Sequence, residues 1–164
     1  MILQTSLFPP KSSWTVPDVF PQFTETETVA IDLETYDPYL MTCGPGWATG
    51  RGHVVGVGVA TEDWEGYFPI RHEGGGNLDE AMVLRWLKNL LSSTKRDVVP
   101  VAGNILDTII AAPLINENRF SYSLDNLGVL YCDEKKDESL LQDAALAFGI
   151  NPKSEMYKLH AKYV

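Results

Sequence analysis

Residues 29–34, with the sequence VAIDLE, decide the expected fold of this chain. An apolar run that turns polar at its end is typical of a buried strand, and the Tyr-Asp-Pro sequence at 36–38 would end it. Side chains two positions apart on a strand lie on the same face of a sheet. We therefore expect Asp32 and Glu34 to project together, while Leu33 points to the opposite face.

These two carboxylates are the first candidate for a functional group. Neighbouring carboxylates raise each other's pKa unless a cation lies between them. Their oxygen atoms suit hard divalent cations such as Mg²⁺ or Mn²⁺. The same spacing recurs at Glu25 and Glu27, in a polar stretch that we expect to be exposed. The D-x-E pattern alone therefore leaves open both a metal site and a solvated strand end.

The rest of the chain predicts a single α/β domain. Residues 1–27 are rich in Pro and Thr and predict an extended N-terminal lead-in, and residues 28–164 form the domain. Two strands joined by a tight polar stretch predict an antiparallel meander, and helices follow it. Asn77 and Glu80 have capping-box spacing, and Gly149 ends the last helix. The expected strands are 53–60, 66–70 and 98–101, and the expected helices are 79–91, 109–116, 124–131 and 138–148.

The composition is that of an ordinary globular protein. The 164 residues are 45% hydrophobic and 21% charged, which excludes a disordered, collagen-like or coiled-coil chain. No apolar run is long enough to span a membrane, and the N-terminus lacks the pattern of a secretory signal. We therefore expect a soluble, cytoplasmic protein that does not bind membranes. Cys43 and Cys132 are expected to be free thiols.

The charge balance bears on possible partners. Thirteen basic and 22 acidic residues give a formal net charge of −9, whereas nucleic-acid-binding proteins are usually basic. An acidic chain can still contact nucleic acid if its carboxylates hold metal ions that bind the phosphates. Net acidity that only maintains solubility is the simpler interpretation.

Several separated segments resemble, in order, the 3′→5′ proofreading exonuclease domain of phage-type family A DNA polymerases. They include VAIDLETYDPYL, the glycine-rich loop, GHVVGVGVA, GYFPIRHEGGGNLDE and DTIIAAPLINENRFSYSLDNL. The resemblance implies a ribonuclease H-like α/β fold, a mixed sheet flanked by helices. It also implies two Mg²⁺ or Mn²⁺ ions held by four acidic residues, with Asp32 bridging both ions and Glu34 holding one. The implied substrate is the 3′ end of single-stranded DNA, the implied partner a polymerase domain, and the implied location the host cytoplasm.

The chain departs from the resembling family at two motifs. The second, H-N-x-x-x-D, belongs on a helix between parallel strands, but here only three residues separate Val101 from Ile105, too few for a crossover. Asp107 is the candidate to replace the lost carboxylate. The third motif, Y-x-x-x-D, would follow Val164, so the domain is expected to be truncated before it. We expect either local rewiring around residues 98–110 or completion by a second chain, for example in a homo-oligomer.

Other residues carry weaker signals. Arg71 and His72 are candidates to approach the phosphates of a single strand, and Tyr36 is a candidate to stack on a terminal base. A polar loop and structural packing are the respective alternatives. The charged run at 133–138 favours a solvated helix start.

Three functions remain open on the sequence. The intact Asp32 and Glu34 favour a metal-dependent 3′→5′ deoxyribonuclease, with weak or no activity expected for this chain alone. The missing motifs favour a non-catalytic module that binds a nucleic acid or a polymerase, or a fragment whose remaining motifs lie on a separate polypeptide.

Overall fold

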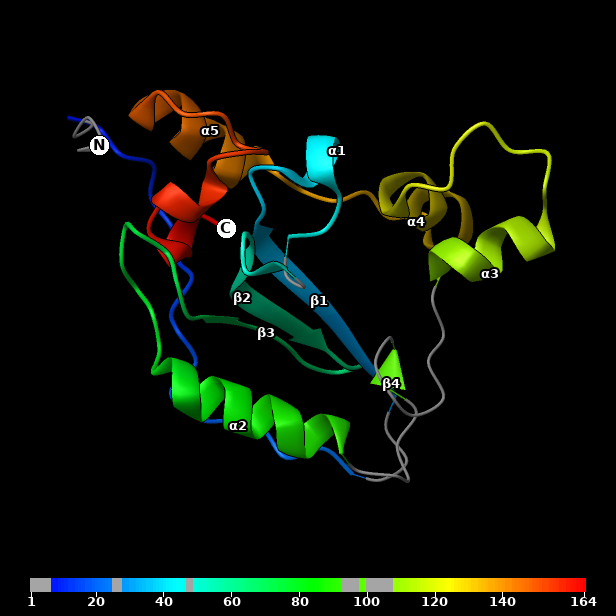
Figure 1. Cartoon of the computed structure of the whole chain (residues 1–164), viewed down its shortest axis with the longest axis horizontal. Helices are drawn as coiled ribbons and strands as arrows, with labels where there is room; N and C mark the ends of the chain where they lie inside the picture. The colour runs from blue at the N-terminus through cyan, green and yellow to red at the C-terminus, as the bar shows by residue number, and fades with distance from the viewer. Residues whose placement is uncertain (1–6, 25–27, 47–48, 93–97, 100–107) are drawn as a thin grey trace.

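The computed structural model describes residues 7–24, 28–46, 49–92, 98–99 and 108–164, in which helices surround a small mixed sheet (Figure 1). The strands are β1 (Val29–Tyr36), β2 (His53–Ala60), β3 (Glu65–Pro69) and β4 (Val98–Val99). The α-helices are α1 (Leu40–Cys43), α2 (Glu80–Leu91), α3 (Thr108–Ile115), α4 (Leu124–Cys132) and α5 (Ser139–Phe148). Two short 3₁₀ helices, η2 (Met156–Lys158) and η3 (Ala161–Tyr163), follow α5.

The sheet has the strand order β3-β2-β1-β4. β1 pairs with β2, and β2 with β3, in antiparallel fashion, which confirms the expected meander. β4 pairs with β1 in parallel. The expected α/β class with a mixed sheet is therefore confirmed, and the strand that carries Asp32 and Glu34 lies inside the sheet rather than at its edge.

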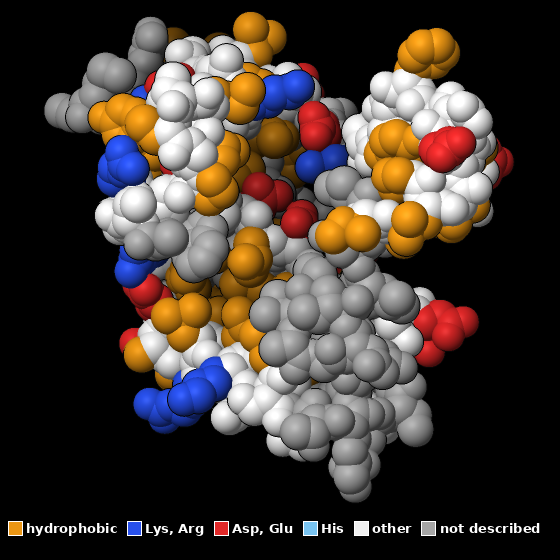
Figure 2. All heavy atoms as spheres, turned by 45° about the vertical axis from the view of Figure 1, so that its right-hand side comes forward, with side chains coloured by type: hydrophobic (Ala, Val, Ile, Leu, Met, Phe, Trp, Pro, Cys, Tyr) orange, Lys and Arg blue, Asp and Glu red, His pale blue; other side chains and the backbone are white. Residues whose placement is uncertain are grey.

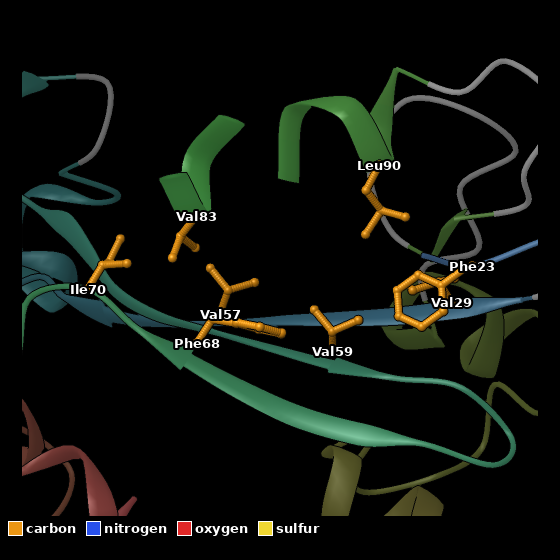
Figure 3. Packing of buried hydrophobic residues seen from close by; sticks show 8 residues of the cluster. All are labelled: Phe23, Val29, Val57, Val59, Phe68, Ile70, Val83 and Leu90. Atoms are coloured by element: carbon orange, nitrogen blue, oxygen red, sulfur yellow. The ribbon is translucent and has the colours of Figure 1, made fainter. Parts of the chain in front are cut away.

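One face of the sheet packs against α2. Figure 3 shows Val83 and Leu90 of α2 pointing toward strand residues that include Val57, Val59 and Phe68, all of them buried. The alternation of side chains along β2 places Val57 and Val59 on this face. Each such side chain stabilises the fold by about 1.5–3 kcal/mol when fully buried, so this face forms the main core.

The N-terminal segment contributes to the same core. Phe23 is buried there, and the ring of Phe20 stacks on Phe68 with 5.6 Å between ring centroids. The indole Nε1 of Trp86 donates a hydrogen bond to the carbonyl oxygen of Pro21 at 3.0 Å. The described part of the expected lead-in therefore lacks helix and strand but helps to build the domain.

A second cluster joins α5 to the C-terminal segment, with Ala144, Leu159 and Tyr163 at its centre. This cluster is tied to the loop after β3. The Glu73 N–H donates to the Tyr157 carbonyl oxygen at 2.8 Å, and the Ala161 N–H donates to the Gly75 carbonyl oxygen at 3.1 Å. α5 is consequently held against the end of the sheet.

Most element boundaries lie within two residues of those expected. β2 has the expected bounds, whereas β1 continues to Tyr36 because that residue still pairs with His53. The short helix α1 lies at the start of the glycine-rich segment that follows β1. Gly149 follows α5 with φ = 66°, as its expected role at the helix end requires.

The cap of α2 differs from the expectation. Asp79, not Asn77, is the N-cap, and its Oδ1 accepts a hydrogen bond from the Met82 N–H at 2.8 Å. The Asn77 side chain instead bonds both backbone groups of His72, at 2.7 Å to the N–H and 2.8 Å to the carbonyl oxygen. The capping-box prediction was therefore wrong by two residues, because Asn77 closes the loop before the helix.

The segment expected to be rewired is described in part. β4 covers Val98–Val99 and α3 begins at Thr108, so eight residues join a strand parallel to β1 to the next helix. Residues 100–107, which include Asp107 and most of the segment expected to be rewired, lie outside the described residues. In the part of the chain that the structure describes, no helix is both long and apolar enough to cross a membrane.

Candidate functional site

Asp32 and Glu34 lie on the face of the sheet opposite the main core. In the antiparallel register, Asp32 is paired with Gly58 and Glu34 with Gly56. Cross-strand partners share a face, so the two carboxylates face two positions without side chains. Asp32 is exposed and Glu34 is half-buried. Leu33 is on the core face, as expected, although 42% of it remains exposed.

Tyr67 of β3 fills the space above Gly56. A Cβ atom at position 56 would collide with the Tyr67 ring and hydroxyl. The glycine therefore lets the tyrosine lie across β2, toward the strand that carries Glu34. The Tyr67 hydroxyl is 2.7 Å from Nε2 of His72.

His72 links this face of the sheet to the C-terminal segment. Its ring is only 3% exposed, and its Nδ1 is 3.1 Å from the carbonyl oxygen of Leu159. Because a carbonyl oxygen can only accept, Nδ1 carries the proton and the Tyr67 hydroxyl donates to Nε2. The pKa of His72 is lowered to about 4, chiefly by burial; the hydrogen bond to the Leu159 carbonyl opposes the shift and the nearby His160 adds to it. The ring is therefore neutral at pH 7.

The carboxylate pair has the electrostatics of a crowded acidic site. Burial raises the pKa of Glu34 above its ordinary value, and the charges of Asp32 and Glu138 raise it further, whereas Lys136 lowers it. Burial also raises the pKa of Tyr67, and the charge of Glu34 adds to this effect. The tyrosine hydroxyl therefore stays protonated beside the carboxylate.

Three of these residues had no functional interpretation from the sequence. The GVGV sequence at 56–59 indicates space for a large side chain such as that of Tyr67, because two glycines at alternate positions leave one face of a strand open. Lys136 and Glu138 belong to the charged run interpreted as a solvated helix start. The charges of Lys136 and Glu138 act on Glu34 only because of the way the chain folds after α4. No local pattern in the sequence therefore marks these two residues.

The residues expected to contact DNA have partners within the protein. The Nε and Nη2 atoms of Arg71 donate hydrogen bonds to the Glu80 carboxylate, at 2.9 and 2.6 Å. The ring of Tyr36 lies 4.4 Å from that of Tyr157, centroid to centroid. Arg71 is exposed and Tyr36 half-buried. Their contact with DNA, like that of the buried His72, stays a prediction.

The donor set suits a hard divalent cation. Among the described residues, no group of three or more His, Cys, Asp or Glu side chains converges in metal-binding geometry. Asp32 and Glu34 therefore offer two carboxylates. Mg²⁺ is commonly held by one or two carboxylates together with substrate phosphates and water, so the pair fits one such ion.

Comparison with known proteins gives one informative match. The sequence matches no protein-family model. It is 39% identical to a DNA-directed DNA polymerase of Pseudomonas phage M6 over 187 positions, which cover 99% of this chain and 28% of that protein. Since this chain has 164 residues, the matched stretch includes at least 23 positions with no counterpart here. Almost the whole chain is thus related in sequence to just over a quarter of the length of a phage DNA polymerase.

Proposed function

We propose that this chain is a 3′→5′ exonuclease-like domain of a phage-type DNA polymerase, with a ribonuclease H-like fold. The observation that carries the proposal is the placement of Asp32 and Glu34 side by side on an inner strand, opposite Gly56 and Gly58. The relationship to a phage DNA polymerase supports it. A mixed sheet in which β1 lies antiparallel to β2 and parallel to β4 is compatible with that fold.

In this proposal Asp32 and Glu34 hold Mg²⁺ or Mn²⁺ at the 3′ end of a DNA single strand. A bound divalent ion would supply Lewis-acid polarisation of the phosphodiester and a more acidic water. Gly58 leaves room for a phosphate beside Asp32, whereas the Tyr67 ring occupies the space above Gly56. The exposed Arg71 and the half-buried Tyr36 are the proposed DNA contacts at the margin of the site.

We further propose that hydrolysis by this chain alone is weak. Two divalent ions carry four positive charges, while the described residues offer only Asp32 and Glu34 to offset them. Even two unit charges 4 Å apart repel by about 4 kcal/mol at an effective dielectric of 20. The loss of that much transition-state stabilisation corresponds to roughly a thousandfold in rate. Asp107, outside the described residues, remains the candidate for a further carboxylate.

The missing crossover is part of the same proposal. The phage polymerase has at least 23 positions more than this chain within the matched stretch. A further strand parallel to β4 would need a crossover of a dozen or more residues after β4, whereas only eight residues connect β4 to α3. We place the extra positions in this connection, where the second motif of the resembling family belongs.

The alternative is a non-catalytic module that binds a nucleic acid or a polymerase domain. The observation that favours it is the limited donor set, since no third acidic, histidine or cysteine side chain joins Asp32 and Glu34 among the described residues. Such a module would keep the sheet while having lost the chemistry.

Release of nucleotides from a 3′-labelled DNA single strand, in Mg²⁺ and in Mn²⁺, tests the proposal. We expect slow release that the Asp32→Ala variant abolishes, at a rate roughly a thousandfold below that of an ordinary proofreading domain. Asp63→Ala is the matched control, because this exposed carboxylate lies in the turn between β2 and β3. Release that Asp32→Ala leaves unchanged would come from a contaminant, and absence of release with intact DNA binding would favour the non-catalytic module.

A further inference from the structure

A β-bulge in β2 lies directly beyond the carboxylate pair. Glu34 pairs with Gly56 in the antiparallel ladder. The next residue of β1, Thr35, pairs with Val54, so the register skips Val55. An extra residue on one strand of an antiparallel pair is the pattern of a bulge, which changes the face to which the following side chains point. The face of β2 that adjoins the carboxylates is therefore built differently on the two sides of Val55.

The bulge places His53, rather than Val54, on the carboxylate face of the sheet. An unbroken register would pair Tyr36 with Val54, but Tyr36 pairs with His53. Cross-strand partners share a face, and the ring centroids of Tyr36 and His53 lie 5.1 Å apart. Val54 instead packs against the main core on the opposite face. Since Tyr36 follows Glu34 by two positions, both rings lie on the carboxylate face, about 7 Å further along β1.

A third ring reaches the same place from the C-terminal segment. Tyr157 of η2 has its ring centroid 4.4 Å from that of Tyr36. Its carbonyl oxygen accepts a hydrogen bond from the Glu73 N–H at 2.8 Å, which ties the segment to the loop after β3. The rings of Tyr36, His53 and Tyr157 are each half-buried, so part of each is accessible to solvent. The described residues thus gather three rings at the end of β1.

The surroundings of the carboxylate pair combine charge with apolar surface. Figure 2 shows acidic side chains beside hydrophobic ones in the hollow between the part of the molecule that carries the sheet and the part that carries α3 and α4. Proteins that bind single strands neutralise the phosphates and stack the bases on aromatic side chains. A divalent ion held by carboxylates can take a substrate phosphate as a further ligand. The carboxylate face therefore offers a phosphate site followed, along β1, by a site for a base.

We propose that the rings of Tyr36, His53 and Tyr157 form a platform on which the 3′-terminal base of a DNA single strand stacks. This inference rests on the proposed function, which puts the phosphate of that nucleotide at the carboxylate pair. His53 and Tyr157 are the binding residues that it adds. Because every base has a flat apolar face, such a platform orients the end of the strand without selecting its sequence.

Binding of two different 3′ ends tests the platform. One DNA single strand has a normal terminal nucleotide, and the other has an abasic terminal nucleotide. Their affinities are measured by fluorescence anisotropy of a 5′ label in Ca²⁺, a hard cation that accepts oxygen ligands. We expect the parent to bind the normal end about tenfold more tightly, as is usual for one stacked base. Tyr157→Leu should lose most of this preference, whereas Tyr157→Phe keeps the ring and should retain it.

The preference for a terminal base distinguishes stacking from a structural role of Tyr157. If the ring only packs the C-terminal segment, Tyr157→Leu lowers both affinities by the same factor and keeps their ratio. Tyr131→Leu is the matched control, because this tyrosine is exposed on α4, and it should retain the preference. His53→Leu is the second variant, which should weaken the preference even if Tyr157→Leu does not fold. Full preference in the variants, or a parent that does not prefer the normal end, would overturn the inference.

Comparison with nucleotide release separates this inference from the proposed function. A preference for the normal end without release of nucleotides in Mg²⁺ or Mn²⁺ would keep the platform and favour the non-catalytic module. Release of nucleotides by a parent that lacks the preference would keep the proposed function and overturn the platform.

Discussion

His72 shows how one residue joins the face of the sheet that carries Asp32 and Glu34 to the C-terminal segment. Its ring is held between the Tyr67 hydroxyl and the Leu159 carbonyl oxygen, which are far apart in the sequence. The ring is buried and neutral, so a proton can be added only against the loss of hydration. This cost makes stability depend on pH.

We expect the parent to lose stability between pH 6.5 and about 4, in part because of His72. In the folded state the pKa of His72 is about 4, against an ordinary value of 6.5. The unfolded chain therefore binds more protons in this range, and the contribution is fully present above pH 6.5 and lost as the pH falls toward 4. A pKa shift of this size corresponds to about 3 kcal/mol in the free energy of unfolding.

Urea unfolding at pH 7 and at pH 5 measures this dependence. His72→Gln should be less stable than the parent at pH 7 but should lose less stability on acidification. His53→Gln removes another histidine and should retain the full dependence of the parent. Equal losses in His72→Gln and the parent would assign the acid sensitivity to other groups.

At the level of elements, the N-cap of α2 shows how a neighbouring loop decides which residue caps a helix. Val83 and Leu90 of α2 are buried in the core, and Trp86 and Leu87 pack against it. The cap itself depends on which side chain the preceding loop leaves available, and here Asn77 is committed to His72. Asp79 therefore takes the capping position.

We expect Asp79→Ala to destabilise the protein by about 1 kcal/mol, the usual cost of losing a capping side chain. The reason is that the Met82 N–H would lose its partner at the first turn of α2. Asp79→Asn keeps an acceptor at the same place and serves as the control in thermal or urea unfolding. A loss as large in Asp79→Asn as in Asp79→Ala would mean that the cap bond is not what Asp79 contributes.

At the level of the whole molecule, α3 and α4 present apolar side chains to solvent. The exposed ones include Leu114, Ile115 and Leu124, and Phe120 in the loop between the two helices is exposed as well. α3 is apolar almost throughout its length, whereas α2 has one apolar face. Apolar surfaces of this kind favour association. They lie in the part of the chain that follows the short connection from β4.

We expect the protein to form dimers or larger species at micromolar concentration, because association would cover the apolar side chains of α3. Light scattering at several concentrations measures this. The variant Leu114→Glu places a charge at a position that is 85% exposed and should shift the population toward the monomer. Leu146→Glu on α5, where the leucine is 84% exposed, is the control and should not. A parent that stays monomeric throughout would show that this surface does not drive self-association.

The sequence by itself determined the strands, the presence of α2 and the placement of Asp32 and Glu34 on one face of β1. These features follow from the side-chain repeat of two residues in a strand and about 3.6 residues in a helix. Such repeats relate residues that are close in the sequence, so they can be recognised without knowledge of the fold. The end of β1 did not follow from the sequence, since Tyr36 belongs to this strand only through its partner His53.

The tertiary structure alone decided what surrounds the carboxylates. Tyr67 reaches over β2 because the sheet places it above Gly56, and the His72 ring meets a carbonyl oxygen 87 positions away. The charge of Lys136, in the segment between α4 and α5, lowers the pKa of Glu34 on β1. Contacts between such distant residues depend on the packing of the whole chain and on the entropy of closing long loops, neither of which leaves a local pattern in the sequence.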